Sequence, residues 1–296
     1  MAAQRSKRAC CYLRPAQSGC QRVIRTNLRY HRPDSLAAAS DLLWSHRQDI
    51  AVLGGGTHLL PRMTRDQESV SHIVDLKALG LDGVNISANG VSIGSRVTYD
   101  QVLRHDALTR ILPLLARVSH GVTGGRQVRN IGTLGGSACF AMPGSDMPGA
   151  LVGLRSRFRI HGPTGFREVD STDFFTSAFV NALEPGEFLH SFDILDIPTA
   201  TGYHKIKHSA GSWPIATATA ALWEGQRLEI TLGGVQETPV RIDVTKVADQ
   251  PEEFAAAIDA AITEPWDDVL APGSYRRRVA AAAAKRALSE LRRRVA

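Results

Sequence analysis

The chain has 296 residues, 43% apolar and 22% charged, an ordinary globular composition that can form two or three separate cores. Its apolar runs are shorter than the roughly 20 residues of a membrane span, and the N-terminus lacks the apolar core of a signal peptide, so a cytoplasmic protein is expected. The formal net charge of +6 arises in residues 1–27, which hold six of the 35 basic residues and no acid, leaving 29 basic against 29 acidic residues.

Residues 1–27 are predicted to be a disordered basic tail. A basic nucleic-acid binder is one alternative, but no base-reading motif accompanies the charge, so no nucleic-acid partner is predicted. Three of the four cysteines, Cys10, Cys11 and Cys20, lie in this tail without a Cys-x-x-Cys pair. Their spacing favours neither a zinc site nor an iron–sulfur cluster. The fourth, Cys139, is expected to be a small buried residue, and no metal site is predicted in this chain.

The first predicted elements form a small α/β unit. Pro33, Asp34 and Ser35 give a capping signal for an amphipathic helix over residues 36–45. Apolar strands are predicted over residues 50–53 and 71–76. The first of these strands runs directly into a glycine-rich loop. That loop therefore lies at the carboxyl end of a strand, where α/β proteins usually bind their ligands.

The middle of the chain is predicted to be an α+β subdomain. In chain order we expect a strand over 90–94, a helix capped by Thr98, helices over 112–118 and 147–154, and a hairpin of 158–160 with 166–169. From residue 201 onward the segments become longer. They predict three strands, over 202–208, 215–222 and 227–233, then helices over 251–263 and from Ser274 onward. The eight basic residues between 275 and 296 are expected to face solvent or an acidic partner surface.

Two glycine-rich segments give the strongest functional signal. Residues 54–61 read Gly-Gly-Gly-Thr-His-Leu-Leu-Pro, and residues 128–146 contain Gly-Thr-Leu-Gly-Gly-Ser. Small residues let backbone N–H groups come close to an anion. Each segment alone is compatible with a tight turn. Together, about 80 residues apart, they indicate one long ligand that carries phosphate groups.

The Rossmann dinucleotide fingerprint fits the first segment only in part. Gly54, Gly56 and the acidic Asp75 stand at suitable spacing. Leu59, however, stands where the third glycine belongs, and Pro61 falls where the phosphate-binding helix should run. A different type of nucleotide-binding fold is therefore indicated.

The order of these segments resembles a known family. Residues 54–61, residues 129–137 (Arg-Asn-Ile-Gly-Thr-Leu-Gly-Gly-Ser) and residues 141–148 (Ala-Met-Pro-Gly-Ser-Asp-Met-Pro) are similar to the FAD-binding medium subunit of molybdenum hydroxylases, the xanthine dehydrogenase and carbon monoxide dehydrogenase family. The resemblance extends from about residue 28 to the C-terminus. Further matching motifs are Tyr-His-Arg-Pro at 30–33, Asp-Phe-Phe at 173–175, Pro-Gly-Glu-Phe-Leu at 185–189 and Ser-Tyr-Arg-Arg at 274–277.

The resemblance implies an α+β fold, namely the FAD-binding fold of the vanillyl-alcohol oxidase and p-cresol methylhydroxylase type. Its two α/β subdomains would span residues 28–80 and 81–198, within a FAD-binding domain of residues 28–198. An α+β domain over residues 199–296 would follow. The resemblance further implies an oxidoreductase subunit that takes electrons from a [2Fe–2S] subunit and passes them to an external acceptor. A small iron–sulfur subunit with two [2Fe–2S] clusters and a large molybdopterin subunit would complete a heterotrimer or a dimer of heterotrimers.

The resemblance also assigns the cofactor-binding residues of the chain, none of them catalytic. The first pyrophosphate loop would be Gly54, Gly55, Gly56, Thr57 and His58; the second would be Thr133, Leu134, Gly135, Gly136 and Ser137; and Asp146, Leu189, Lys205 and Trp213 would lie near the flavin. Many members have Ala-Gly-Gly-Thr-Asp in the first loop, so His58 replaces an acid. In the second loop, usually Thr-Ile-Gly-Gly-Asn, Leu134 and Ser137 are mild departures.

Four of these residues also have an interpretation that involves no cofactor. His58 would bond a phosphate if protonated, or would simply lie at the surface. Asp146 suits a helix N-cap as well as a flavin contact. Lys205 could be a solvated strand residue. Trp213 stands where carbon monoxide dehydrogenases place a tyrosine against the flavin, but it would also fit a core.

Two further functions stay open alongside the electron-transfer subunit. One is a stand-alone flavin-dependent oxidase of the same fold, and the other is a non-catalytic nucleotide-binding module. Residues 137–146 contain no histidine for a covalent flavin link, so noncovalent FAD is expected. The substrate of the complex is left open among carbon monoxide, purines, aldehydes and N-heterocycles such as nicotine derivatives.

Overall fold

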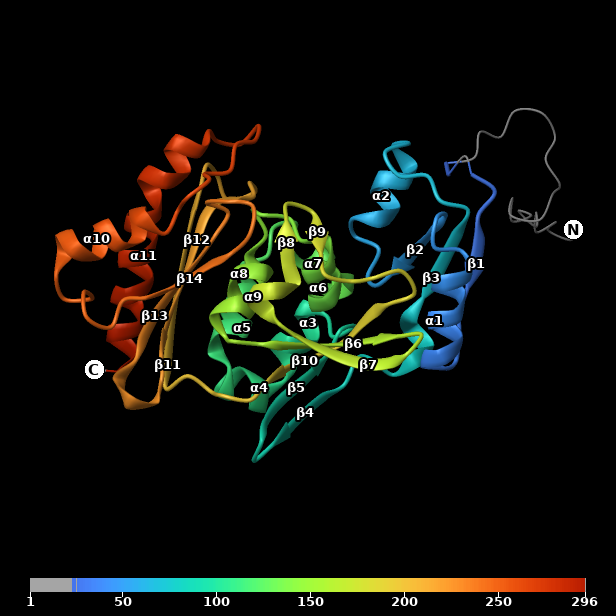
Figure 1. The fold of residues 1–296 in the computed structure, drawn as a ribbon, viewed down its shortest axis with the longest axis horizontal. Helices are drawn as coiled ribbons and strands as arrows, with labels where there is room; N and C mark the ends of the chain where they lie inside the picture. The colour runs from blue at the N-terminus through green and yellow to red at the C-terminus, as the bar shows by residue number, and fades with distance from the viewer. Residues whose placement is uncertain (1–22, 25, 296) are drawn as a thin grey trace, which may run out of the picture.

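The protein is described by a computed structural model that covers residues 23–24 and 26–295. The predicted basic tail, with its three cysteines, lies largely outside the described residues. The three larger sheets follow one another along the long axis of the molecule, in the order of the chain (Figure 1). The cofactor motifs lie where the first and second of these regions meet.

The N-terminal region is a three-stranded parallel sheet with the strand order β1-β3-β2. Its elements are β1 (Arg29–His31), α1 (Leu36–Ser45), β2 (Ile50–Leu53), α2 (Leu59–Thr64), β3 (His72–Asp75) and the short 3₁₀ helix η2 (Leu76–Leu79). Helix α1 has the predicted bounds because the Ser35 side chain accepts a hydrogen bond from the Ala38 N–H. Helix α2 was not predicted. Pro61 lies in its first turn, where a missing N–H costs nothing.

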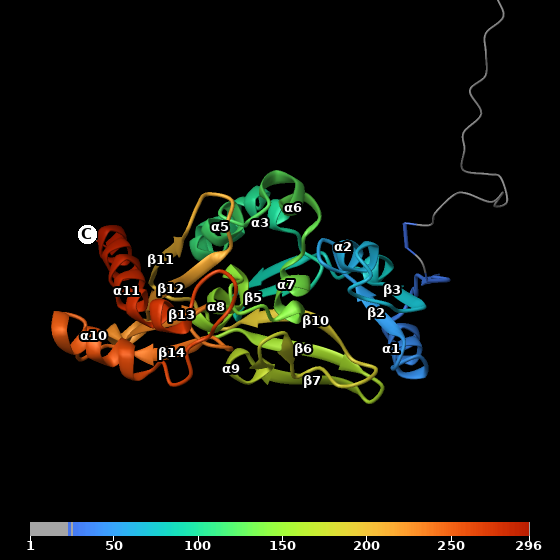
Figure 2. The same cartoon turned by 90° about the horizontal axis from the view of Figure 1, so that it is seen from above.

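The middle region is built on a five-stranded antiparallel sheet of order β4-β5-β10-β6-β7, with the helices α3, α5 and α6 gathered on one side of it (Figure 2). The strands are β4 (Val84–Ser87), β5 (Gly90–Gly94), β6 (Arg157–Gly162), β7 (Gly165–Asp170) and β10 (Phe188–Ile194), with a small hairpin of β8 (Phe175–Ser177) and β9 (Val180–Asn181). The predicted strand over 90–94 and the predicted hairpin are confirmed. One core, centred on Leu115, Leu151 and Phe158, joins sheet and helices.

The helices of this region are short. They are α3 (Tyr99–Arg104), α4 (Asp106–Ile111), α5 (Pro113–His120), α6 (Gly125–Ile131), α7 (Leu134–Phe140), α8 (Asp146–Gly153) and α9 (Ser171–Phe174). Thr98 caps α3 as predicted, in a reciprocal capping box with Gln101. The second glycine segment was expected to be a loop. That expectation is wrong for residues 134–137, which form the first turn of α7 with Thr133 as its N-cap.

The C-terminal region is an antiparallel sheet of order β11-β12-β13-β14. It contains β11 (Ala200–Lys207), β12 (Pro214–Leu222), the 3₁₀ helix η3 (Glu224–Gln226), β13 (Leu228–Gly233), β14 (Val240–Asp243), α10 (Pro251–Ala260) and α11 (Gly273–Val295). Three strands were predicted, and β14 is the one that the sequence did not indicate. Helix α11 packs on β11 and β12, and a Cβ atom on Gly202 would lie 2.0 Å from the Ala287 carbonyl oxygen. The glycine is therefore required by this close approach.

The basic residues of α11 were expected to face solvent or an acidic partner surface, and Arg276 does neither. Its side chain is fully buried and donates hydrogen bonds to the carbonyl oxygens of Ile215 (2.6 Å) and Gly234 (2.8 Å) and to Asp268 (2.5 Å). Arg277 and Arg292 form ion pairs with Asp259 and Asp249. Much of the positive charge of this helix is therefore neutralised within the chain itself.

Candidate cofactor-binding site

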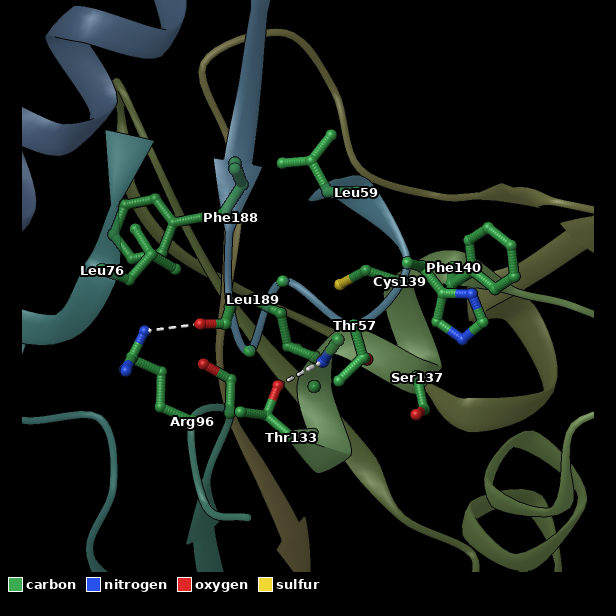
Figure 3. A pocket seen from close by; sticks show the side chains of 18 of the residues that line it. Thr57, Leu59, Leu76, Arg96, Thr133, Ser137, Cys139, Phe140, Phe188 and Leu189 are labelled. Carbon is green, nitrogen blue, oxygen red and sulfur yellow. Dashed lines mark hydrogen bonds between the residues drawn. The ribbon is translucent and has the colours of Figure 1, made fainter. Parts of the chain in front are cut away.

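A cleft of about 380 Å³ lies between the N-terminal sheet and the helices of the middle region (Figure 3). Both glycine segments line it, through residues 54–59 and through Thr133 and residues 135–137. Apolar side chains supply much of the remaining wall, namely Val52, Leu76, Cys139, Phe140, Phe179, Leu183, Phe188 and Leu189. Segments about 80 residues apart in the sequence thus face the same space, as the two motifs predicted.

The first glycine segment is an open loop that follows β2. The backbone N–H groups of residues 54–58 donate no hydrogen bond to any other described residue. Gly56 has a φ of +73°, a backbone conformation that residues other than glycine rarely adopt. A Cβ on Gly55 would lie 1.8 Å from the Ile131 carbonyl oxygen of the facing helix α6. Free N–H groups of successive residues at the end of a strand form a concave site for an anion.

The second glycine segment differs, because its N–H groups are already used. Leu134 donates to the Val97 carbonyl (2.9 Å), Gly135 to the Ser95 carbonyl (2.9 Å), and Gly136 to the Thr133 hydroxyl (2.9 Å). The expectation that both segments offer free N–H groups is therefore wrong for this one. A Cβ on Gly135 would lie 2.4 Å from the Ser95 carbonyl oxygen, so this glycine serves packing.

Arg96 holds the first loop in place and was missed by the sequence analysis. Its Nη1 donates to the Gly54 carbonyl oxygen at 3.0 Å (Figure 3). The same nitrogen donates to Asp75 at 3.2 Å. Asp75 is 6% exposed and also accepts hydrogen bonds from Tyr30 and from the Lys77 N–H. The acid that matched the Rossmann spacing is thus bound by an arginine of the neighbouring region.

His58 stacks on Phe140, with ring centroids 4.1 Å apart, and its ring lies 5.8 Å from that of Trp213. Burial, and then the positive charge of Arg62, lower the pKa of His58. A neutral imidazole is therefore favoured, which argues against the hypothesis of a protonated His58 on a phosphate. Trp213 does not itself line the cleft, but this stack of rings connects it to the wall.

Asp146 and Lys205 meet in a buried ion pair beside the cleft. The Lys205 Nζ lies 2.8 and 3.0 Å from the two carboxylate oxygens and 2.7 Å from the Gly121 carbonyl oxygen. Asp146 is 2% exposed and also accepts a hydrogen bond from the Tyr203 hydroxyl. Burial, followed by the charge of Asp146, raises the pKa of Tyr203. Lys205 is therefore a bound lysine, and its interpretation as a solvated strand residue is wrong.

The N-cap of α8 is Ser145, so Asp146 is the first residue of the helix and not its cap. A carboxylate in the first turn still suits the helix dipole. Ser137 lines the cleft and is hydrogen-bonded to Tyr99 at 2.5 Å, and the charge of Asp146 contributes to the raised pKa of Tyr99 after burial.

The two leucines predicted to bind the cofactor differ in where they lie. Leu189 is 2% exposed and lines the cleft, whereas Leu134 is fully buried in the core and does not. Of the predicted residues, Leu134, Asp146, Lys205 and Trp213 thus lie outside the cleft wall. In the part of the chain that the structure describes, no three or more His, Cys, Asp or Glu side chains could hold a metal ion.

The cleft fits a nucleotide cofactor because it combines free N–H groups for phosphate with apolar walls for flat rings. Together with the α+β architecture, it defines a nucleotide-cofactor-binding protein. Residues 25–198 match the family described as the FAD binding domain in molybdopterin dehydrogenase. The chain belongs to this family, which confirms the resemblance, the fold class and a FAD-binding domain on this chain.

Curated relatives of nearly equal length support the same family. The carbon monoxide dehydrogenase medium chain of Afipia carboxidovorans is 33% identical over 92% of this chain and 99% of its own length. The glyceraldehyde dehydrogenase medium chain of Sulfolobus acidocaldarius is 30% identical over 88% of this chain and 97% of its own. Both are named as medium chains, that is, as parts of larger assemblies.

A solved structure of carbon monoxide dehydrogenase from Hydrogenophaga pseudoflava matches with a TM-score of 0.82 and 28% identity, over 90% of this chain and 98% of that one. Quinoline 2-oxidoreductase from Pseudomonas putida 86 matches with a TM-score of 0.80 and 27% identity, over 90% and 97% of the two chains. Among the described residues, no helix is both long and apolar enough to cross a membrane.

Proposed function

We propose that this chain is the FAD-binding, electron-transferring subunit of a molybdenum hydroxylase. It would receive electrons from a small subunit with [2Fe–2S] clusters and pass them to an external acceptor. A large molybdopterin subunit would oxidise the substrate, in a heterotrimer or a dimer of heterotrimers. The division into domains of residues 28–198 and 199–296 belongs to this proposal.

The observation that carries the proposal is the open first glycine loop. Residues 54–58 line the cleft, and their N–H groups have no partner among the described residues, while Gly55 packs closely against the facing helix α6. Such groups suit the pyrophosphate of FAD. The apolar wall around Leu76, Phe188 and Leu189 suits its ring systems. When bound, the flavin would supply the redox chemistry.

The chain's own groups would set the surroundings of that cofactor. Lys205 neutralises Asp146, and Tyr203 donates to the same carboxylate, so the pair adds little net charge beside the cleft. Because all three of its ammonium hydrogens have acceptors, Lys205 acts by fixing Asp146. His58 and Phe140 form an aromatic part of the cleft wall, with Trp213 against His58, and would limit the access of water.

The test combines cofactor content with electron transfer. Acid precipitation of the purified chain should release its flavin to the supernatant, as noncovalent binding requires. The chain alone should then show no reduction of its flavin absorbance by an organic substrate under anaerobic conditions. The same chain co-purified with its two partner subunits should be reduced by the substrate of the complex.

A stand-alone flavin oxidase is the second candidate, since it would share the fold and the cofactor. It predicts that the purified chain alone is reduced by an organic substrate and reoxidised by oxygen. Turnover by the isolated chain at the rate of the cellular activity would replace the electron-transfer proposal with this one. A chain without any flavin absorbance would contradict both and leave a non-catalytic nucleotide-binding module.

A further inference from the structure

A second cavity, of about 250 Å³, lies where the middle and C-terminal regions meet. It shares no lining residue with the cofactor cleft. Its wall comes from residues 155–157 at the start of β6, residues 170–172 at the start of α9, residues 195–196 after β10, and Arg241 on β14. Helices α8 and α9 and strand β14 lie close together in both views (Figures 1 and 2).

Arginine side chains dominate the inner end of this cavity. The Arg155 Nε donates a hydrogen bond of 3.0 Å to Glu229, which is 2% exposed, and its Nη2 lies 2.9 Å from the other carboxylate oxygen without forming a hydrogen bond. The guanidinium also lies 4.1 Å from the Trp223 ring centroid. Arg227 pairs with the same carboxylate at 3.0 Å. Arg241 stands at 3.9 Å from it. Arg227 has a second partner, Asp243, at 3.2 Å, so the Glu229 carboxylate is shared mainly by Arg155 and Arg241, of which Arg241 is the more distant.

Arg241 is the least satisfied of the three. Besides the distant Glu229, its contact among the described residues is a long hydrogen bond of 3.4 Å to the Val152 carbonyl oxygen. Its side chain is 29% exposed, so the guanidinium is partly withdrawn from water. A guanidinium has five N–H donors, and most of those on Arg241 stay available to a ligand in the cavity.

Ser156 gives a second and independent indication of a ligand. It is 1% exposed and lines the cavity, yet its Oγ has no hydrogen-bond partner within the described residues. A buried hydroxyl without a hydrogen-bond partner destabilises the folded state. The preceding residue, Arg155, has a φ of +50°, a left-handed conformation that is costly for a residue with a side chain. The chain thus holds a strained residue and an unpaired hydroxyl at the same site.

We propose that this cavity binds a small oxyanion of the size and charge of phosphate or a carboxylate. The guanidinium of Arg241 and the hydroxyl of Ser156 would donate to its oxygens. Three arginines and two aspartates line the cavity. Arg155 is paired with Glu229 and Arg157 with Asp170, so Arg241 is the arginine of the lining that a ligand can pair with. The aspartates, Asp170 and Asp196, are exposed at the rim and would repel a polyanion. Nucleic acids and nucleoside triphosphates are therefore poor ligands.

The test uses the full-length chain with FAD bound, so that the first glycine loop does not compete for the anion. Isothermal titration calorimetry would follow potassium phosphate in one arm and sodium acetate in the other, with chloride keeping the ionic strength constant. Saturable binding of either ion at one site is expected. Arg241→Gln should weaken it by about tenfold or more, because a hydrogen bond to a charged group is lost.

Arg227→Gln is the matched control, because Arg227 pairs with the same Glu229 but does not line the cavity. It should retain oxyanion binding within about threefold, because Arg227 is half exposed and solvent screens its charge. Ser156→Ala should affect stability and binding in different directions. Without oxyanion, the variant should be as thermally stable as the wild type or more stable, because an unpaired hydroxyl is removed. Its affinity for the oxyanion should be lower than that of the wild type.

Two results would overturn the proposal. One is wild-type protein that binds neither phosphate nor acetate more strongly than chloride. The other is equal binding by the wild type and the Arg241→Gln variant, which would place the ion elsewhere. A crystal structure from phosphate-containing solution that shows only water against Ser156 would also contradict oxyanion binding, because water would then be the hydrogen-bond partner of the hydroxyl.

Discussion

The two glycine segments look alike in sequence but differ in how their backbone groups are used. In the first, the N–H groups of residues 54–58 are free, and the loop is held from outside by Arg96. In the second, residues 134–136 donate to Val97, Ser95 and Thr133, and the segment is the first turn of a helix. Glycine in the first segment permits ligand access and close loop contact, whereas glycine in the second permits packing of the backbone.

The largest effect is expected from Gly55→Ala. The new Cβ would lie 1.8 Å from the Ile131 carbonyl oxygen, so the loop or helix α6 must move. We expect a loss of at least about 4 kcal/mol in the free energy of unfolding and loss of bound FAD. Denaturant unfolding and the flavin-to-protein absorbance ratio measure both.

Gly83→Ala is the control for this change, because a Cβ there meets no atom within 4 Å. Its free energy of unfolding should stay within about 0.5 kcal/mol of the wild-type value. A Gly55→Ala protein with full flavin content and unchanged unfolding would show that the contact with Ile131 does not constrain the loop.

Arg96→Gln should have the next largest effect. It removes the hold on the Gly54 carbonyl and leaves Asp75 buried without its cation. Removing one partner of a buried ion pair costs about 3 kcal/mol or more, so lower stability and weaker FAD binding are expected together. Arg62→Gln is the comparison, since Arg62 also lines the cleft but pairs with Glu68 at a largely exposed site. Arg62→Gln should lower the free energy of unfolding by less than about 1 kcal/mol. Equal effects of the two changes would argue against Arg96 as the residue that positions the loop.

Gly135→Ala separates the two roles of glycine. The Cβ would lie 2.4 Å from the Ser95 carbonyl oxygen, which accepts the hydrogen bond of the Gly135 N–H. We expect a stability loss of about 2 kcal/mol, with the FAD affinity of the folded protein within about threefold of the wild type. Flavin titration at a temperature where the variant is fully folded measures that affinity. A variant of native stability that no longer binds FAD would instead assign Gly135 to phosphate contact.

Short-range signals in the sequence predicted much of this fold. The caps at Ser35 and Thr98 and the strand over 90–94 depend on residues a few positions apart, and they were correct. The helices α6 and α7 were missed because glycine-rich segments have low helix propensity, and their ends are held by tertiary contacts such as Leu134 N–H to the Val97 carbonyl. Spacing alone could not show that partner.

The candidate site shows the same limit. The motifs predicted that the two segments meet, and the cleft confirms it. They did not show that Arg96 joins Asp75 and Gly54, which lie 21 and 42 positions away in the sequence. The pairing of Asp146 with Lys205 spans 59 positions. Such contacts follow from the order of strands and helices in space, which local patterns do not encode.

The smallest effect concerns pH and the first loop alone. Burial lowers the pKa of His58, so the folded protein binds a proton at this residue less readily than the unfolded chain does. Stability from this residue is fully present above the unfolded pKa of about 6.5 and is lost as the pH falls toward the lower folded pKa. His58→Phe keeps the stack on Phe140 and removes the titration. We expect the free energy of unfolding of the wild type to fall by up to about 1 kcal/mol more than that of this variant between pH 7.5 and 5.5, measured by denaturant unfolding.

Because other buried histidines titrate equally in both proteins, the difference between the two curves of stability against pH isolates His58. Parallel curves would mean that His58 titrates as it does in the unfolded chain, and that the loop is more open to water than its contact with Phe140 indicates.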